Sequence, residues 1–221
     1  MGDSCCFSFS MGRIEALIKE EIKRLTNETV FIHSVQVGSS LTADVVNSYL
    51  HDANVYLESG YKDIAEVPEL QNGFNAIGFS QGSQFLRGYV QRYNTPRVGK
   101  LISIGGQMQG VFGLPRCPGI NVTLCEYARE LIDLGVYRDF VQHHLIQAQY
   151  WHDPWDNDLY LKSSNFLADI NNERSTKNET YKKNLMSLDA LVMVKFLQDS
   201  FVQVRGTITH FITFLTINQA N

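Results

Sequence analysis

The chain has 221 residues, of which 44% are hydrophobic and 19% charged, the composition of a globular domain large enough to bury a core. Its formal net charge of −4, without a basic cluster, argues against a nucleic-acid partner. Because no apolar run reaches about 18 residues, the sequence predicts no stable membrane span.

The first third of the chain predicts helices on either side of one strand. Residues 10–26 should form an amphipathic helix with Ser10 as its N-cap. Residues 30–37 are predicted to be a strand, and residues 41–64 to be mostly helical. One face of the first helix carries the apolar residues Ile14, Leu17, Ile18, Ile22 and Leu25.

The next segment has the pattern typical of a catalytic serine. An apolar run leads into the string GFSQG at 78–82, and helical spacing follows over 84–93. Strand, Gly-x-Ser-x-Gly and helix in this order form a nucleophile elbow, whose sharp turn projects the serine hydroxyl away from the backbone. Glycines let neighbouring segments approach, and the helix N-terminus offers N–H groups to an oxyanion. The pattern therefore predicts Ser80 as a nucleophile.

Two further strands are predicted, at 100–104 and 191–197. Because strands alternate with helices, the strands should form a mostly parallel sheet with both faces covered. The Gly-rich apolar segment 107–118 leaves a central strand, at the end of the sheet where such folds bind ligands. Helical spacing then dominates, and we interpret the region from about 107 to 188 as an inserted helical cap.

Histidines in this region raise the question of a metal site. His143 and His144 are adjacent, and His152 precedes a carboxylate. No cysteine or second carboxylate stands at ligand spacing, and adjacent histidines on a helix point to different faces. We interpret all three histidines as structural and predict no metal.

Several long strings resemble the palmitoyl-protein thioesterase family, in the same order. The resemblance extends from residue 1 to about residue 202 and implies one α/β-hydrolase domain over 1–221, with a divergent tail at 203–221. The strings are GFSQGSQFLR at 78–87, LISIGGQMQGVFGLPRCPG at 101–119, AQYWHDP at 148–154, FLADIN at 166–171 and YKKNL at 181–185.

The resemblance also implies the reaction and the residues that perform it. Members hydrolyse fatty-acyl thioesters on protein cysteines through a serine acyl-enzyme, without a cofactor, so palmitoylated proteins are the implied substrates. Ser80 would be the nucleophile, and the backbone N–H groups of Gln81 and Met1 would bind the oxyanion. The loop residues implied in substrate binding are Gln107, Gln109, Val111, Phe112 and Leu114.

The chain departs from the family pattern at the two other catalytic positions. Gln203 stands where the family has its catalytic aspartate, and the family's histidine would fall beyond residue 221. Asp199 matches a second, structural aspartate, and His210 follows Gln203 too closely for an intervening strand. The family also has a buried strand before the position of Met1. We therefore expect a domain that is incomplete at both ends and inactive as written.

The resemblance implies an oxidising compartment, and the cysteines are consistent with it. Cys117 and Cys125 bracket a short Pro/Gly loop and either remain free thiols or form the disulfide that the resemblance implies. Adjacent Cys5 and Cys6 match a vicinal pair in the family. Tyr61 and Tyr93 occupy the positions of the family's other disulfide.

Three Asn-x-Thr sequons begin at Asn27, Asn121 and Asn178. The sequence has no signal peptide at its start, which we interpret as a missing N-terminus. The resemblance implies a lysosomal or secretory-pathway glycoprotein.

Three alternatives stand beside this interpretation. The serine elbow alone would also suit an esterase or lipase that acts on oxygen esters. The string MGDSCC at 1–6 could instead mark a myristoylated and palmitoylated membrane anchor. Finally, the chain could be a non-catalytic isoform or an incomplete gene model.

Overall fold

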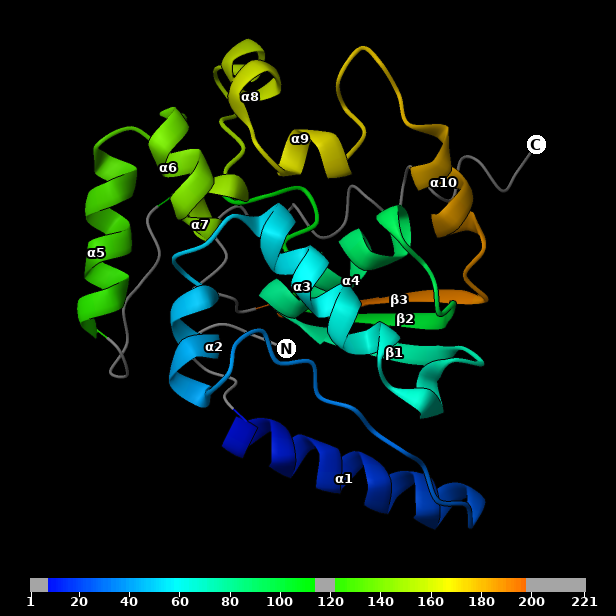
Figure 1. The fold of residues 1–221 in the computed structure, drawn as a ribbon. Helices are drawn as coiled ribbons and strands as arrows, with labels where there is room; N and C mark the ends of the chain where they lie inside the picture. Colours follow the sequence, from blue (N-terminus) through cyan, green and yellow to red (C-terminus); the bar gives the residue numbers. More distant parts are fainter. Residues whose placement is uncertain (1–7, 114–121, 198–221) are drawn as a thin grey trace.

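A computed structural model describes residues 8–113 and 122–197, and a three-stranded parallel sheet lies at its centre (Figure 1). Its strands are β1 (Phe74–Phe79), β2 (Val98–Ile104) and β3 (Ala190–Val194), in that spatial order. Ile77 lies opposite Ile102, which lies opposite Val192, so the three strands share one register across the sheet. The three strands were predicted, and their parallel pairing is confirmed.

Two helices pack closely together on one side of this sheet. They are α3 (Ala53–Ala65) and α4 (Gln81–Arg92), the second of which begins directly after β1. Gly60 makes the close approach of the helices possible, because a Cβ there would lie 2.2 Å from a ring carbon of Phe85. The main core lies here and includes Leu57, Tyr89 and Leu101, each at most 1% exposed.

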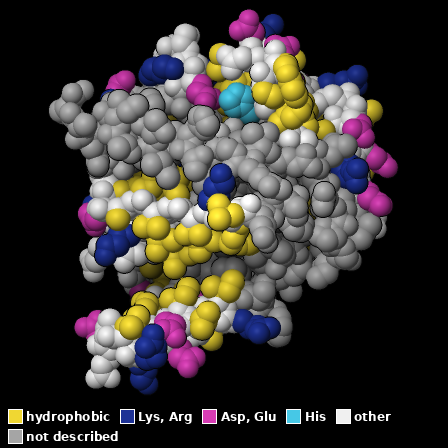
Figure 2. Space-filling view, turned by 180° about the vertical axis from the view of Figure 1, so that it is seen from behind, with side chains coloured by type: hydrophobic (Ala, Val, Ile, Leu, Met, Phe, Trp, Pro, Cys, Tyr) yellow, Lys and Arg dark blue, Asp and Glu magenta, His cyan; other side chains and the backbone are white. Residues whose placement is uncertain are grey.

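The other face of the sheet is less covered than predicted. Ile77, Val192 and Val194 alternate with less exposed positions of their strands and are 41%, 46% and 40% exposed. Figure 2 shows apolar side chains gathered on this side. Helix α1 (Ser8–Thr26) lies below the sheet in Figure 1, and its Leu17 is 58% exposed. The expectation of two covered faces is therefore wrong for the described residues.

Two local predictions in the first third are also wrong. The helix α1 begins at Ser8, so Ser10 lies within it and is not its N-cap. Residues 30–37 form no strand, and within the described residues they have no ladder partner. The backbone at Val37 is instead bonded by side chains of the following helix. Residues with a high β-propensity favour an extended backbone, but a strand also needs a neighbouring strand to pair with, and the local sequence does not determine whether one is present.

Capping residues divide the helical region that was predicted over 41–64. The helix α2 (Leu41–Asn47) is capped by Ser40, whose side chain accepts the N–H of Ala43. Asp52 then caps α3 by accepting the N–H of Asn54 at 2.8 Å. The 48–53 turn between these helices becomes an attachment point for later parts of the chain.

Between β2 and β3 the described residues are mainly helical, as predicted. We call residues 122–170 the helical segment, which lies to the left of and above the sheet in Figure 1. A second core cluster, with Leu131 and Leu145, packs against Tyr49 of the 48–53 turn. The helices are α5 (Val122–Asp133), α6 (Asp139–His144), α7 (Ile146–Gln149), α8 (Asn157–Ser163), α9 (Leu167–Ile170) and, beyond the segment, α10 (Glu179–Met186).

None of the helices in residues 8–113 and 122–197 combines the length and the apolar character needed to cross a bilayer.

An aromatic stack joins the ends of α3 and α4. The rings of Tyr61 and Tyr93 lie with centroids 4.2 Å apart and an interplanar angle of 4°. Tyr89 is tilted against both, with centroids 6.2 and 6.3 Å away. Stacked aromatic side chains therefore occupy the two positions at which the sequence comparison placed a family disulfide.

We predict that this stack contributes measurably to stability. Alanine substitution of Tyr61, Tyr93 and both should give a coupling of about 0.5–1.5 kcal/mol in the free energy of unfolding, measured by chemical denaturation. As a control, Tyr61 paired with the 44%-exposed Tyr127 of α5 should give additive losses. Additive losses for Tyr61 and Tyr93 themselves would contradict the prediction.

Candidate active site

Ser80 lies at the turn between β1 and α4, with a φ of 50° and a ψ of −118°. A positive φ is strained for a residue with a Cβ, and it persists only where surrounding contacts enforce it. One such contact is the hydrogen bond that the Ser80 N–H donates to the carbonyl of Ile104 at 2.8 Å. The side chain is half-buried. The predicted position of Ser80 at a strained strand-to-helix turn is confirmed.

The tightness of the turn depends on Gly78. A Cβ at this position would lie 2.6 Å from both the Cα and the N of Ser83, which leaves no room for a side chain. The Ser83 hydroxyl donates to the carbonyl of Gly78 at 2.9 Å, and the Ser83 N–H donates to that of Ser80 at 3.0 Å. These bonds hold the start of α4 against the end of β1.

The start of α4 carries Gln81, whose backbone N–H was expected to bind an oxyanion. Among the described residues, the Ser80 hydroxyl accepts no hydrogen bond from this turn, so it does not compete for the N–H groups there. Gln81 is the first residue of the helix, and its side chain is 1% exposed. Its Nε2 donates to the carbonyl of Ser48 at 3.0 Å, which ties the elbow to the 48–53 turn.

A buried polar chain connects α4 to the loop after β2. Gln84 donates through Nε2 to the carbonyl of Gln107, and its Oε1 accepts from Arg87 at 2.6 Å. Arg87, which is 1% exposed, also donates to Asn171 at 2.6 Å. Burial lowers the pKa of Arg87 to about 10, so the guanidinium is still charged at neutral pH. The chain holds Gln107, a predicted substrate-binding residue, beside the helix that begins at the elbow.

The described loop residues Gln109, Val111 and Phe112 contact residues 151–155, which were not among the predicted site residues. Val111 forms a parallel bridge with Trp151. The ring of Phe112 packs against two tryptophans, with its centroid 5.0 Å from that of Trp151 and 4.7 Å from that of Trp155. Trp151 and Trp155 are the only two tryptophans in the sequence. Their rarity is the feature that could have marked them as candidate site residues. Gln109 is half-buried and accepts a hydrogen bond through its carbonyl.

The three histidines of the helical segment all contact protein groups. His143 pairs with Asp52 at 2.8 Å. His144 bonds the carbonyl of Phe140 at 2.8 Å, and His152 bonds that of Gln109 at 3.0 Å. In the part of the chain that the structure describes, no group of three or more His, Cys, Asp or Glu could hold a metal ion.

The predicted glycosylation sites Asn27 and Asn178 lie in the described part of the chain, and both are exposed. Asn27 follows α1 directly, and Asn178 is the N-cap of α10. Cys125 lies in α5, but its side chain is not described, so the proposed disulfide is untested. The candidate residues that lie outside the described part of the chain are Met1, Cys5, Cys6, Leu114, Cys117, Asn121, Asp199, Gln203 and His210.

We predict that Gly78→Ala disrupts the elbow. The added methyl group meets backbone atoms that cannot rotate away, and overpacking of this kind costs about 1–3 kcal/mol in the free energy of unfolding. Gly12→Ala is the matched control, because a Cβ at that position of α1 meets nothing within 4 Å. Denaturation curves should show a loss for Gly78→Ala and none for Gly12→Ala. Equal stability of the two variants would refute this account of the turn.

Comparison with known proteins agrees with the geometry of the elbow. A family model described as palmitoyl protein thioesterase matches residues 1–216. A Caenorhabditis elegans protein named palmitoyl-protein thioesterase 1 is 50% identical over 202 residues, which cover 91% of this chain and 65% of that protein. A Dictyostelium discoideum protein named palmitoyl-protein thioesterase 3 is 35% identical over 197 residues, covering 87% of this chain and 62% of that protein.

A more distant relative is the mouse protein named lysosomal thioesterase PPT2, 30% identical over 139 residues that cover 61% of this chain and 45% of that protein. The chain spans less than two thirds of the length of each of these relatives. The parallel sheet and the elbow, together with the family match, confirm the predicted α/β-hydrolase fold. Because the family model matches nearly the whole chain, this chain belongs to the palmitoyl-protein thioesterase family.

Proposed function

We propose that the protein hydrolyses the thioester between a long-chain fatty acyl group and a protein cysteine, with Ser80 as its nucleophile. The observation that carries the proposal is the strained turn at Ser80, in a chain whose relatives are named thioesterases. Palmitoylated proteins or other fatty-acyl thioesters would be the substrates, and the proposed chemistry requires no cofactor.

The proposed reaction has two steps. Ser80 Oγ attacks the acyl carbonyl carbon as its proton passes to a base. The C–S bond then breaks as the base gives this proton to the leaving sulfur, which releases the cysteine thiol. Water then attacks the new oxygen ester, releases the fatty acid and restores the serine hydroxyl. In each step the carbonyl oxygen becomes an oxyanion, which the backbone N–H groups of Gln81 and Met1 would stabilise. The position of Gln81 at the start of α4 supports its role.

The acyl chain would be held by the loop after β2 and by the helical segment. Burial of Gln107 beside α4, and the packing of Val111 and Phe112 against Trp151, support this assignment. Leu114 would extend the same wall. We propose residues from about 107 to 188 as the cap of a single domain.

We also propose that the protein is a lysosomal or secretory-pathway glycoprotein, because a relative is named a lysosomal thioesterase. Asn27, Asn121 and Asn178 are the proposed glycan sites. A glycan on Nδ2 of Asn178 would leave its Oδ1 free to accept the N–H of Thr180, at 3.0 Å, so the cap of α10 would persist.

We predict that a polypeptide of residues 1–221 turns over palmitoyl thioesters poorly. Gln203, at the position of the catalytic acid, is neutral and cannot stabilise a protonated base, and loss of that charge in a serine triad costs about 10⁴ in turnover. The measurement is the release of thiol from a palmitoyl thioester, with a matched oxygen ester to test the esterase alternative. Ser80→Ala is the control.

Turnover within about a hundredfold of an ordinary enzyme's ~10 s⁻¹, abolished by Ser80→Ala, would overturn this prediction. It would mean that Asp199 and His210, or another pair, complete the site. A higher rate on the oxygen ester than on the thioester would favour the esterase alternative.

We further predict that Cys117 and Cys125 form a disulfide when the protein is made in an oxidising compartment. Their Cα atoms should then lie about 4.4–6.8 Å apart. Peptide mapping without reductant should recover the two cysteines in one linked species that separates on reduction. Alkylation of both thiols without prior reduction would exclude the bond.

A further inference from the structure

Two side-chain bonds hold the loop after β2 by its backbone carbonyls. The carbonyl of Gln107 accepts from Nε2 of Gln84, which lies in α4. The carbonyl of Gln109 bonds Nδ1 of His152 at 3.0 Å, and this nitrogen is the donor because a carbonyl oxygen only accepts. Gln107 and Gln109 are proposed substrate-binding residues, and Phe112 of the proposed acyl-binding wall belongs to the same loop. The two bonds therefore help to place the proposed site.

The loop is closely packed against the helical segment directly after Gln109. Gly110 has a φ of 89°, and a Cβ at this position would lie 2.4 Å from a methyl carbon of Leu167 and 2.6 Å from the carbonyl oxygen of Tyr150. Close packing transmits small displacements, because neighbouring groups leave no free space to absorb them. A shift of the side chains that bind the two carbonyls should therefore reach Phe112.

The bond to Gln107 is continued through α4 as far as Glu173. Oε1 of Gln84 accepts from Nη2 of Arg87 at 2.6 Å, which fixes the end of the Gln84 amide that points at the loop. Nη1 of Arg87 donates to Oδ1 of Asn171 at 2.6 Å. Nδ2 of Asn171 donates in turn to Oε1 of Glu173 at 3.4 Å. The Glu173 carboxylate also attracts the buried guanidinium of Arg87.

The bond to Gln109 leads to the same carboxylate by a different route. The ring of His152 is stacked on that of Tyr160, with centroids 4.0 Å apart and an interplanar angle of 16°. Tyr160 is fully buried, and its hydroxyl donates to Oε2 of Glu173 at 2.5 Å. The two oxygens of one carboxylate thus end both series of contacts, Oε1 the series from Gln107 and Oε2 the series from Gln109.

We propose that Glu173 is a positioning residue for the loop after β2, which its two carboxylate oxygens hold in place through Asn171 and Tyr160. In Glu173→Gln an amide NH₂ group would meet one of these two donors, and Arg87 would lose a counter-charge. Both carbonyl bonds of the loop should then loosen together. The positioning follows from contacts among the described residues, whereas its consequence for substrate binding rests on the proposed function.

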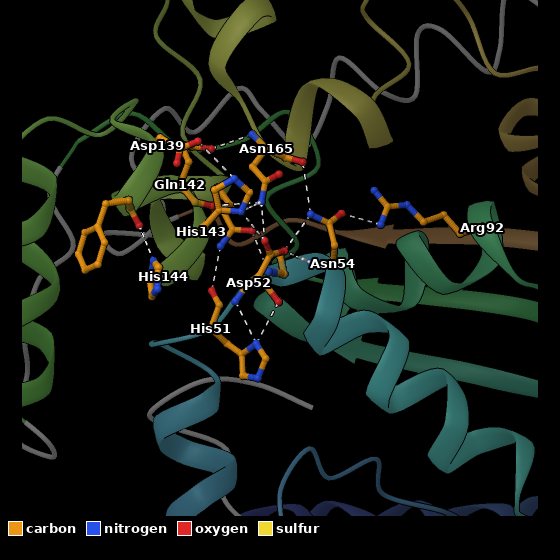
Figure 3. Close-up of polar contacts among 12 residues, drawn as sticks. His51, Asp52, Asn54, Arg92, Asp139, Gln142, His143, His144 and Asn165 are labelled. Carbon is orange, nitrogen blue, oxygen red and sulfur yellow. Dashed lines mark hydrogen bonds and ion pairs between the residues drawn. The ribbon is translucent and has the colours of Figure 1, made fainter.

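Asp52 provides a matched carboxylate for comparison (Figure 3). Like Glu173, it is held by an amide and a ring, because Oδ2 accepts from Nδ2 of Asn165 and pairs with Nδ1 of His143, each at 2.8 Å. Its Oδ1 accepts the N–H of Asn54 at 2.8 Å and caps α3, a bond that Asp52→Asn can keep. In the part of the chain that the structure describes, no hydrogen bond of Asp52 reaches the loop after β2.

The test is hydrogen–deuterium exchange of the whole chain. Peptides over 107–113 report on the loop, where the N–H of Gly110 donates to the carbonyl of Gln107 at 2.9 Å. The N–H of Val111 donates to the carbonyl of Tyr150 at 2.8 Å and reports on the same loop. Peptides from β1 report on global stability, so a change confined to the loop is distinguished from a general loss of stability.

Relative to β1, the loop should exchange about three- to tenfold faster in Glu173→Gln than in the parent protein, the range expected for the loss of one hydrogen bond. Asp52→Asn should leave this ratio at the parent value. Tyr160→Phe removes the hydroxyl that bonds Glu173 but keeps the ring that stacks on His152, so it should raise the ratio by a smaller factor. Equal loop exchange in the parent and in Glu173→Gln would overturn the proposal. If that variant does not fold, equal exchange in the parent and in Tyr160→Phe would overturn it.

Palmitate binding separates this proposal from the proposed function. The affinity for palmitate, measured by tryptophan fluorescence, should fall about three- to tenfold in Glu173→Gln and stay unchanged in Asp52→Asn. Loop exchange that responds to Glu173→Gln, in a parent protein that binds no palmitate, would support the positioning role and contradict the proposed acyl-binding wall. Faster loop exchange with unchanged palmitate affinity would also place the acyl chain elsewhere.

Discussion

The close contact between the end of β1 and the start of α4 is the constraint on which the candidate site depends. Ser80 adopts a positive φ, a conformation that costs on the order of 1–3 kcal/mol. Packing at Gly78 and the hydrogen bond to Ile104 hold it there. Strand β2 therefore positions the serine as directly as β1 does. The parallel register of these strands is thus a requirement of the site as well as of the core.

The features that sequence reasoning predicted correctly are encoded locally. The elbow is a contiguous string in which glycine supplies a close approach, and a strand and a helix flank it, so Ser80 could be located without tertiary information. The incorrect predictions concern contacts between segments that are distant in the sequence. Residues 30–37 have a strand-like composition but no neighbouring strand among the described residues, and the sheet's second face exposes Ile77 and Val192. Periodicity reports which residues are apolar, whereas coverage depends on elements distant in sequence.

The supports of the site were invisible in the sequence for the same reason. Gln84 and the carbonyl of Gln107 are 23 residues apart, and Asp52 and His143 are 91 residues apart. Side-chain hydrogen bonds over such separations leave no periodic pattern, and buried glutamines look like ordinary polar residues in a composition count. The histidines of the helical segment were correctly given protein partners, but the carboxylate that pairs with His143 could not be identified.

The helices around the candidate site are attached to one another by both apolar and polar contacts. Helices α3 and α4 are joined by apolar and aromatic packing, including the Tyr61 stack. The helical segment meets the 48–53 turn through hydrogen bonds and through packing on Tyr49, and its Phe166 and Leu167 belong to the main core. Ser80 belongs to the sheet, whereas Phe112 packs with Trp151 beside the helical segment. The distance between the serine and the proposed acyl-binding wall therefore depends on two links. One is the bond from Gln84 to Gln107, and the other is the 48–53 turn, where Gln81 and Gln147 both donate to the carbonyl of Ser48.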